Sequence, residues 1–139
     1  MMDIPIGLVG TRSVEVTPDL TLAREDDRMP AVLATPMMIC LMEMTARDLI
    51  QPYLPDGWIT VGAVVNVRHL AATPAGATVT VRAEITEVAG KTVTLAVEAH
   101  DGVDKIGEGT HVRAPVELAR FIRRVDAKRA QTMAPEDSL

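Results

Sequence analysis

Residues 35–50 read TPMMICLMEMTARDLI, and this stretch decides the fold. Thr35 followed by Pro36 predicts a helix start, because threonine can cap free N–H groups and proline suits a first turn whose N–H groups have no intrahelical partner. Pro52 predicts that the helix stops shortly before it. The first two turns are apolar apart from Glu43, and a helix that is apolar on every side is expected to be buried.

The rest of the chain is expected to supply strands around this helix. Gly10–Thr17 predicts a first strand, and Leu20–Pro30 predicts a loop or a short helix. After the helix, apolar and polar residues alternate with a period of two, which is typical of a sheet with one buried face. The four strands that this alternation predicts are Ile59–Leu70, Ala77–Val88, Lys91–Ala99 and Lys105–Leu118.

Only one long apolar helix is available to cover the apolar face of that sheet. We therefore expect an α+β protein with a single hotdog domain, in which an antiparallel sheet wraps round one long central helix. This domain would span residues 1–139, with a core over about 10–122, a polar C-terminal tail over about 126–139 and disorder over Met133–Leu139. Strands of this length leave an edge that needs a partner, which predicts a homodimer formed by edge-to-edge sheet pairing.

Composition and charge argue against several classes of protein. The formal net charge is −5, whereas proteins that bind nucleic acids are usually basic. The most apolar stretch, residues 29–46, is interrupted by Pro30, Pro36 and Glu43 and is too short to span a bilayer. The N-terminus shows no basic segment followed by an apolar one, so no signal peptide is expected. We expect a cytoplasmic protein that binds neither nucleic acid nor membrane.

A basic run near the C-terminus stands out against the acidic background. Its spacing is typical of a solvated helix face, and the alternative is a local patch for a polyphosphate ligand. The run consists of Arg120, Arg123, Arg124, Lys128 and Arg129.

Glu43 is the most informative single residue. A carboxylate in an apolar helix is costly unless it is paired or protonated. One interpretation is a structural ion pair with Arg47, which the i,i+4 spacing allows. The other is a desolvated carboxylate that acts as a general base or nucleophile.

Thr35 and His69 are the other candidates for chemistry. Thr35 is either a helix cap or a substrate contact at the positive end of the helix, where an oxyanion would be stabilised. His69 ends a predicted strand and could carry a proton, whereas His100 is expected to be solvated and His111, inside the last strand, is a weaker candidate. No cluster has metal-ligand spacing, and the single cysteine, Cys40, allows neither a cysteine metal site nor an intrachain disulfide.

Several segments together resemble the fluoroacetyl-CoA thioesterases, over roughly residues 10–122. The spacing of Thr35, Glu43 and His69 fits that family without gaps. The segments that carry the resemblance are residues 34–43, Val61-Gly62, VNVRHLAATPAG at 65–76, HDGVDKIG at 100–107 and GTHVR at 109–113.

The resemblance implies a dimeric hotdog enzyme that hydrolyses short or small polar acyl-CoA thioesters and needs no cofactor, because coenzyme A enters as part of the substrate. It implies that Thr35, Glu43 and His69 are catalytic. Gly62 corresponds to a glycine near the substrate, and Arg113 corresponds to an arginine near the acyl site. Arg68, or the basic residues from 120 onward, would then attract the phosphates of CoA.

One segment departs from the family pattern. The fluoroacetyl-CoA enzymes carry phenylalanines before the catalytic threonine, where they form a lid over the acyl group. Here that segment contains Asp26, Met29 and Leu33 and no aromatic residue. Met29 and Leu33 are therefore the expected acyl-site residues, and a broader or different acyl preference is expected because methionine adapts its shape readily.

Two other functions fit the same fold. An acyl-CoA hydratase or dehydratase would need an Asp and His arrangement at a helix start, which the sequence lacks. A non-catalytic acyl-CoA-binding module would bind CoA esters without releasing a thiol. Release of free thiol from an acyl-CoA therefore separates the thioesterase from both alternatives.

Overall fold

The computed structural model describes residues 2–133. Its main elements follow the order expected from the sequence, with one additional helix at the end. Three short 3-10 turns lie at Pro18–Leu20, Leu22–Arg24 and Gln51–Tyr53. The strands and helices are β1 (Val9–Glu15), α1 (Thr35–Ile50), β2 (Trp58–His69), β3 (Thr78–Ala89), β4 (Thr92–His100), β5 (Lys105–Glu117) and α2 (Leu118–Thr132).

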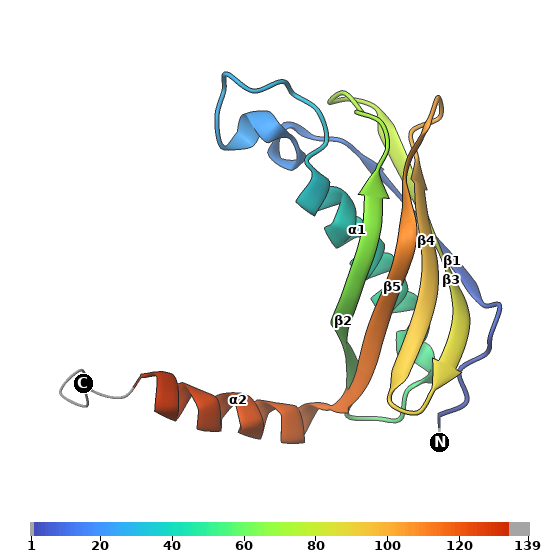
Figure 1. Cartoon of the computed structure of the whole chain (residues 1–139), viewed down its shortest axis with the longest axis vertical. Helices are drawn as coiled ribbons and strands as arrows, with labels where there is room; N and C mark the ends of the chain where they lie inside the picture. The colour runs from blue at the N-terminus through green and yellow to red at the C-terminus, as the bar shows by residue number, and fades with distance from the viewer. Residues whose placement is uncertain (1, 134–139) are drawn as a thin grey trace.

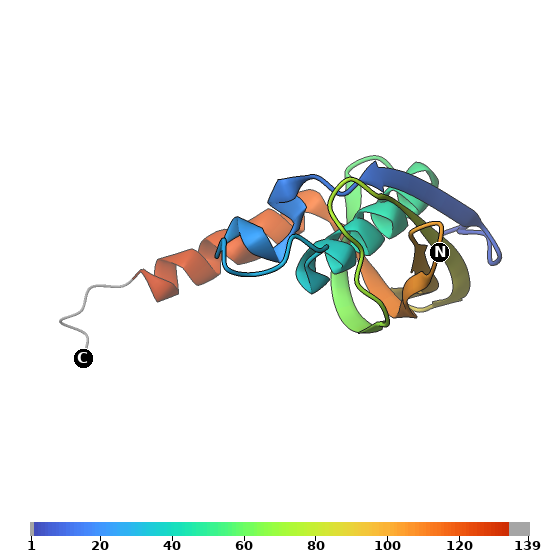
Figure 2. The same ribbon diagram turned by 90° about the horizontal axis from the view of Figure 1, so that it is seen from above.

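The strands form one antiparallel sheet in the order β1-β3-β4-β5-β2. The sheet curves round α1, so the expected sheet wrapped round one central helix is confirmed (Figures 1 and 2). β1 and β2 are the edge strands, and among the described strands β2 pairs only with β5. The free edge of β2 exposes Val64 and Val65, which are 49% and 43% accessible.

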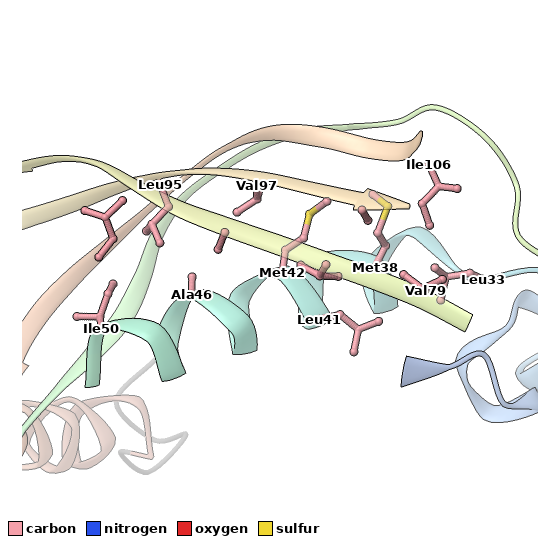
Figure 3. Packing of buried hydrophobic residues seen from close by; sticks show 14 of the residues in the cluster. Leu33, Met38, Leu41, Met42, Ala46, Ile50, Val79, Leu95, Val97 and Ile106 are labelled. Carbon is pink, nitrogen blue, oxygen red and sulfur yellow. The ribbon is translucent and has the colours of Figure 1, made fainter. Parts of the chain in front are cut away.

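The core lies between α1 and the concave face of the sheet. One side of the helix and the inward residues of β3, β4 and β5 interdigitate there (Figure 3). The methionines of the helix fill the space over Gly107, where a Cβ would lie 2.8 Å from Met38 Cε and 3.2 Å from Met42 Cε. Unbranched methionine chains suit this irregular space, which branched side chains would fill poorly. The buried residues of α1 are Met38, Leu41, Met42, Thr45, Ala46 and Ile50.

The opposite side of α1 is not covered by the sheet, which corrects the expectation of a helix buried on every side. Pro36, Cys40 and Arg47 are exposed, and Glu43 and Met44 are half-buried. The reason is geometric, because a single curved sheet can cover only one side of a helix. An apolar face that carries one carboxylate therefore remains open in a single copy of the chain.

The start of α1 also differs from the expectation. The residue at the cap position is Ala34, it makes no side-chain capping bond, and Thr35 is the first helical residue. The interpretation of Thr35 as a helix cap is therefore wrong, and its hydroxyl is free to contact another residue.

The C-terminal region contains a helix that the expected order of elements lacked. The last strand ends at Glu117, and the expected polar tail, as far as residue 132, forms the second half of α2. The basic run lies on this helix, which has no buried residue, so the expected solvated helix face is confirmed. α2 projects away from the sheet past the β2 edge (Figure 1). The expected disorder from Met133 onward falls, apart from Met133, outside the described residues. No helix in the described part of the chain is long and apolar enough to cross a membrane.

Close contact between the β2 and β5 backbones gives a stability prediction. A Cβ added at Gly109 would lie 2.6 Å from Val67 Cα and still closer to the carbonyl oxygen of Asn66. Gly109→Ala should therefore destabilise the protein by at least the ~1–3 kcal/mol typical of overpacking, because backbone atoms must move. Chemical denaturation measures the loss.

Gly107→Ala is the matched control for this prediction. Its Cβ would meet Met38 Sδ at 2.5 Å and the Cε atoms of Met38 and Met42, which belong to unbranched side chains rather than to backbone, so the expected loss is smaller. A loss for Gly107→Ala that equals or exceeds the loss for Gly109→Ala would contradict the close approach of the two strands.

Candidate active site

Glu43 lies in a groove on the open side of α1. The groove has a volume of about 410 Å³. The Glu43 side chain is 38% accessible, so solvent and a ligand can reach its carboxylate. Arg113 of β5 faces it from the sheet, with Nη1 3.5 Å from Glu43 Oε2. The groove is lined by Pro36, Ile39, Cys40, Glu43, Met44, Arg47 and Arg113.

Arg113 is a buried cation whose orientation is fixed by several acceptors. Its side chain is 6% accessible. Nε donates to Thr60 Oγ1 at 2.8 Å, Nη2 donates to the Thr60 carbonyl oxygen at 2.9 Å, and Nη1 lies 3.2 Å from His111 Nε2. Burial lowers the pKa of Arg113, and the facing Glu43 carboxylate opposes that shift. A buried guanidinium needs such partners because an uncompensated buried charge is strongly destabilising.

His111 completes this arrangement, although the sequence made it a weaker candidate than His69. It is only 1% accessible. Its Nδ1 lies 2.8 Å from the Val64 carbonyl oxygen, so Nδ1 carries the proton and donates it, which leaves Nε2 to accept from Arg113. Burial lowers the pKa of His111, and the nearby Arg113 charge acts in the same direction. His111 and Arg113 are two residues apart on β5, so their side chains point to the same face of the sheet. This spacing is the sequence signal that could have placed His111 beside Arg113.

A β-bulge brings Gly62 close to the carboxylate. The register between β2 and β5 shifts between Gly62 and Val64. A Cβ at Gly62 would lie 2.9 Å from Glu43 Oε2 and 3.6 Å from His111 Cε1. A side chain at this position would therefore displace the Glu43 carboxylate from its place beside Arg113.

Thr35 and His69 meet at the other end of α1. Thr35 Oγ1 lies 2.7 Å from His69 Nδ1. His69 Nε2 is buried and has no hydrogen-bond partner among the described residues. A buried polar atom without a partner costs about 1–3 kcal/mol, so this nitrogen is a candidate for contact with a ligand. The cavity beside the pair, about 380 Å³, is lined by Leu22, Val32, Leu33, Thr35, His69, Leu70, Ala71 and Ala72.

The structure thus places the predicted site residues in two groups. Glu43, Gly62 and Arg113 form one group, and Thr35, His69 and Leu33 form the other. Within one copy of the chain the two groups border different cavities.

Met29, the second residue expected near the acyl group, lies in neither group. It is 45% accessible and is in the segment before α1.

Glu43 and His100 each have a defined partner in the structure. The proposed ion pair of Glu43 with Arg47 is wrong, because Glu43 faces Arg113 and Arg47 donates to Asp48 at 3.0 Å. His100 is exposed, as expected, and lies 3.5 Å from Glu98. The described residues contain no group of three or more His, Cys, Asp or Glu side chains that could hold a metal ion.

The buried, neutral state of His111 predicts a pH dependence of stability. The folded protein holds the pKa of His111 below its unfolded value, so between these two pKa values only the unfolded chain binds the proton. Stability should therefore fall as pH drops below about 6.5, by up to ~1.4 kcal/mol for each pH unit between the two values. The free energy of unfolding, measured by denaturant titration from pH 7.5 to pH 5, tests this.

His111→Asn and His100→Asn are the variants to compare. Asparagine keeps a donor near the Val64 carbonyl but does not titrate, so His111→Asn should flatten this part of the pH dependence. His100 is exposed and lies outside this network, so His100→Asn is the matched substitution, and its slope should stay closer to that of the parent than the slope of His111→Asn does. Equal slopes for the parent and His111→Asn would contradict the assignment.

Comparison of the sequence with known proteins gives two matches, and both are fluoroacetyl-CoA thioesterases. The family model described as fluoroacetyl-CoA-specific thioesterase matches residues 16–119. A fluoroacetyl-CoA thioesterase of Streptantibioticus cattleyicolor is 46% identical over 99 residues, which make up 71% of this chain and 71% of that protein.

Solved structures give the same relatives. The fluoroacetyl-CoA thioesterase FlK is 37% identical with a TM-score of 0.85, over 96% of this chain and 99% of that one. FlK variants have been solved with acetyl-CoA and with fluoroacetate and CoA. A thioesterase superfamily member from Thermus thermophilus is 32% identical with a TM-score of 0.83, over 92% and 97% of the two chains.

A hot-dog-like protein from Thermanaerovibrio acidaminovorans has a TM-score of 0.84 at 23% identity, over 90% of this chain and 93% of that one, which supports the fold alone. The matched family model covers most of the domain, and the curated relative extends over more than two thirds of both chains. With its hotdog fold, this chain therefore belongs to the fluoroacetyl-CoA-specific thioesterase family.

Proposed function

We propose that this protein hydrolyses a small acyl-CoA thioester to the free acid and coenzyme A. The observation that carries the proposal is the Glu43 carboxylate, which lies in an open groove and faces the buried Arg113. A carboxylate held in this way can attack a thioester carbonyl or activate water. The named activity of the curated relative and the acetyl-CoA complex of an FlK variant support the same chemistry.

In the proposed reaction Glu43 delivers the attack on the carbonyl carbon, either directly or through a water molecule that it deprotonates. Direct attack forms a mixed anhydride with Glu43 as the C–S bond breaks, and water then attacks the acyl carbonyl of this anhydride and regenerates the Glu43 carboxylate. In either route an oxygen atom from water ends in the product carboxylate, and the leaving thiolate takes up a proton. His69 is suited to proton transfer, because one ring nitrogen contacts Thr35 and the other is buried without a partner among the described residues.

The N–H of Thr35 is the proposed donor to the oxyanion. The N–H groups of Met37 and Met38 both donate to the Ala34 carbonyl, and residue 36 is proline. The Thr35 N–H has no partner among the described residues and lies at the positive end of α1. A donor in this position stabilises the charge that develops on the carbonyl oxygen.

We infer that the working form is a homodimer. Eight residues separate Thr35 from Glu43, a rise of roughly 12 Å along the helix, and their cavities are distinct in one copy. The free edge of β2 exposes Val64 and Val65. Antiparallel pairing of two such edges would cover these residues and place a second copy against the open side of α1. The thioester would then lie between the two copies.

The acyl preference is expected to be broader than, or different from, that of the fluoroacetyl-CoA enzymes. The segment with Asp26, Met29 and Leu33 contains no aromatic residue to form a lid, and Leu33 lines the cavity beside Thr35 and His69. Aliphatic side chains adapt to more acyl shapes than stacked rings do. The proposed substrates are therefore short or small polar acyl-CoA thioesters, with weak selectivity for fluorine.

The proposed reaction needs no cofactor, since coenzyme A arrives with the substrate. We also propose that the protein acts in the cytoplasm. Its one cysteine, Cys40, is a free and exposed thiol, a state that a reducing compartment preserves.

Glu43→Gln tests the central claim. Glutamine keeps the shape of the side chain but can neither attack nor deprotonate water, so the rate of thiol release from acetyl-CoA should fall at least about a hundredfold. Thiol release is measured over a panel of acyl chain lengths. Glu87→Gln, the same change on an exposed side chain of β3, is the control and should keep the parent rate. Parent-like hydrolysis by Glu43→Gln would overturn the mechanism, and CoA-ester binding by the parent without thiol release would favour a binding module.

Thr35→Val and Thr35→Ser test the contact with His69. Valine removes the hydroxyl that holds the ring, so kcat should fall about tenfold or more, the lower range for loss of an oriented proton carrier. Serine keeps the hydroxyl and should retain most of the activity. If the valine variant were as active as the serine variant, the contact would have no role in turnover.

A further inference from the structure

A cleft at the start of α2 lies at the opposite end of β2 from His69. Its volume is about 270 Å³. A larger and mostly apolar cavity, about 340 Å³, shares Trp58, Lys91 and Pro115 with it. We call the first of these the α2 cleft. It is lined by Trp58, Lys91, Pro115, Val116, Glu117, Arg120, Phe121 and Arg124.

Three cations converge on the α2 cleft. Lys91, Arg120 and Arg124 line it, and none of them forms an ion pair with a residue that the structure describes. Arg129, on the same helix, is instead paired with Asp126 at 3.0 Å. Glu117 supplies the one carboxylate of the lining, so positive charge remains in excess. Like charges held this close repel one another, and a bound anion would relieve that repulsion.

Two aromatic side chains border the same cleft. Trp58 and Phe121 are the only tryptophan and the only phenylalanine in the chain. Aromatic faces stack on planar heterocycles, and arginine pairs with phosphate through two N–H groups. Aromatic faces combined with unpaired arginines therefore suit a phosphate-bearing nucleotide better than they suit an aliphatic anion.

The position of the α2 cleft fits one end of an acyl-CoA. On the paired strands β2 and β5, Trp58 is opposite Glu117 and Gly62 is opposite Arg113. Four residues along β2 therefore separate the cleft from the Glu43 groove, roughly 13 Å at strand spacing. Pro115 and Arg113 are two residues apart and point to the same face of the sheet. In an acyl-CoA the extended pantetheine arm likewise places the thioester and the nucleotide at opposite ends of the molecule.

Arg68, the other cation that the sequence suggested for the CoA phosphates, is less suited. It lies at the far end of β2 and pairs with Glu108 at 2.8 Å. Lys105 binds Glu108 at 2.7 Å and Glu98 at 3.3 Å, so the two cations there already face two carboxylates.

We propose that the α2 cleft binds the adenine nucleotide and 3′-phosphate end of the CoA substrate. Arg120, Arg124 and Lys91 contact the phosphates, and Trp58 and Phe121 hold the adenine ring. This inference rests on the proposed function, and it assigns the nucleotide end of the substrate to a site separate from the catalytic groups.

Binding of adenosine 3′,5′-bisphosphate to the full-length protein tests the cleft without any turnover. Isothermal titration calorimetry and the fluorescence of Trp58, the only tryptophan, both report the binding. The double variant Arg120→Glu/Arg124→Glu should bind at least about tenfold more weakly. The control Arg123→Glu/Lys128→Glu makes the same charge change on residues outside the cleft lining and should stay within about twofold of the parent. Equal weakening in both variants, or no binding to the parent, would overturn the proposal.

Kinetics with two substrates separate the nucleotide from the thioester. In the Arg120→Glu/Arg124→Glu variant, KM for acetyl-CoA should rise at least about tenfold with kcat little changed. The acetyl thioester of N-acetylcysteamine lacks the nucleotide, so its kcat/KM should be the same as in the parent. An equal loss on both thioesters would overturn the nucleotide assignment. If the parent hydrolysed neither thioester but bound the bisphosphate through these arginines, the proposed function would fail and the nucleotide site would stand.

Discussion

The candidate site depends on one buried charge, the guanidinium of Arg113. A buried cation is destabilising unless its donors are satisfied and an opposite charge lies near. Thr60 and His111 accept hydrogen bonds from it, and among the described residues only the Glu43 carboxylate forms an ion pair with it, at 3.5 Å. The charge of Arg113 holds the carboxylate in place. Because the contact is long and Glu43 is 38% accessible, the carboxylate is still open to the groove. The same pairing thus serves both stability and chemistry.

The strands around Arg113 are shaped to allow this arrangement. The bulge between Gly62 and Val64 interrupts the regular ladder, and the side chain of His111 donates to the Val64 carbonyl at that point. The lack of a side chain at Gly62 leaves room for the carboxylate. A polar network of this kind specifies one geometry, because any member left without a partner in the interior is costly.

Three surfaces are left uncovered in one copy of the chain. They are the open side of α1, the free edge of β2 and the projecting helix α2 (Figures 1 and 2). The sheet covers one side of the helix, and the second side carries Glu43. The proposed dimer covers the β2 edge and the open side of α1, and the proposed nucleotide cleft lies at the start of α2.

The sequence by itself determined the fold class, the order of the elements from β1 to β5, and Thr35, Glu43 and His69 as candidates for chemistry. Local patterns suffice for this, because the period-two alternation and the apolar run from Met37 to Met44 depend only on neighbouring residues. It did not reveal that Thr35 contacts His69, that Glu43 faces Arg113 rather than Arg47, or that His111 belongs to the site. These contacts join residues 34 to 70 positions apart, except for the pair on β5. They depend on how the sheet curves round the helix and where β2 bulges, and only the tertiary structure decides this.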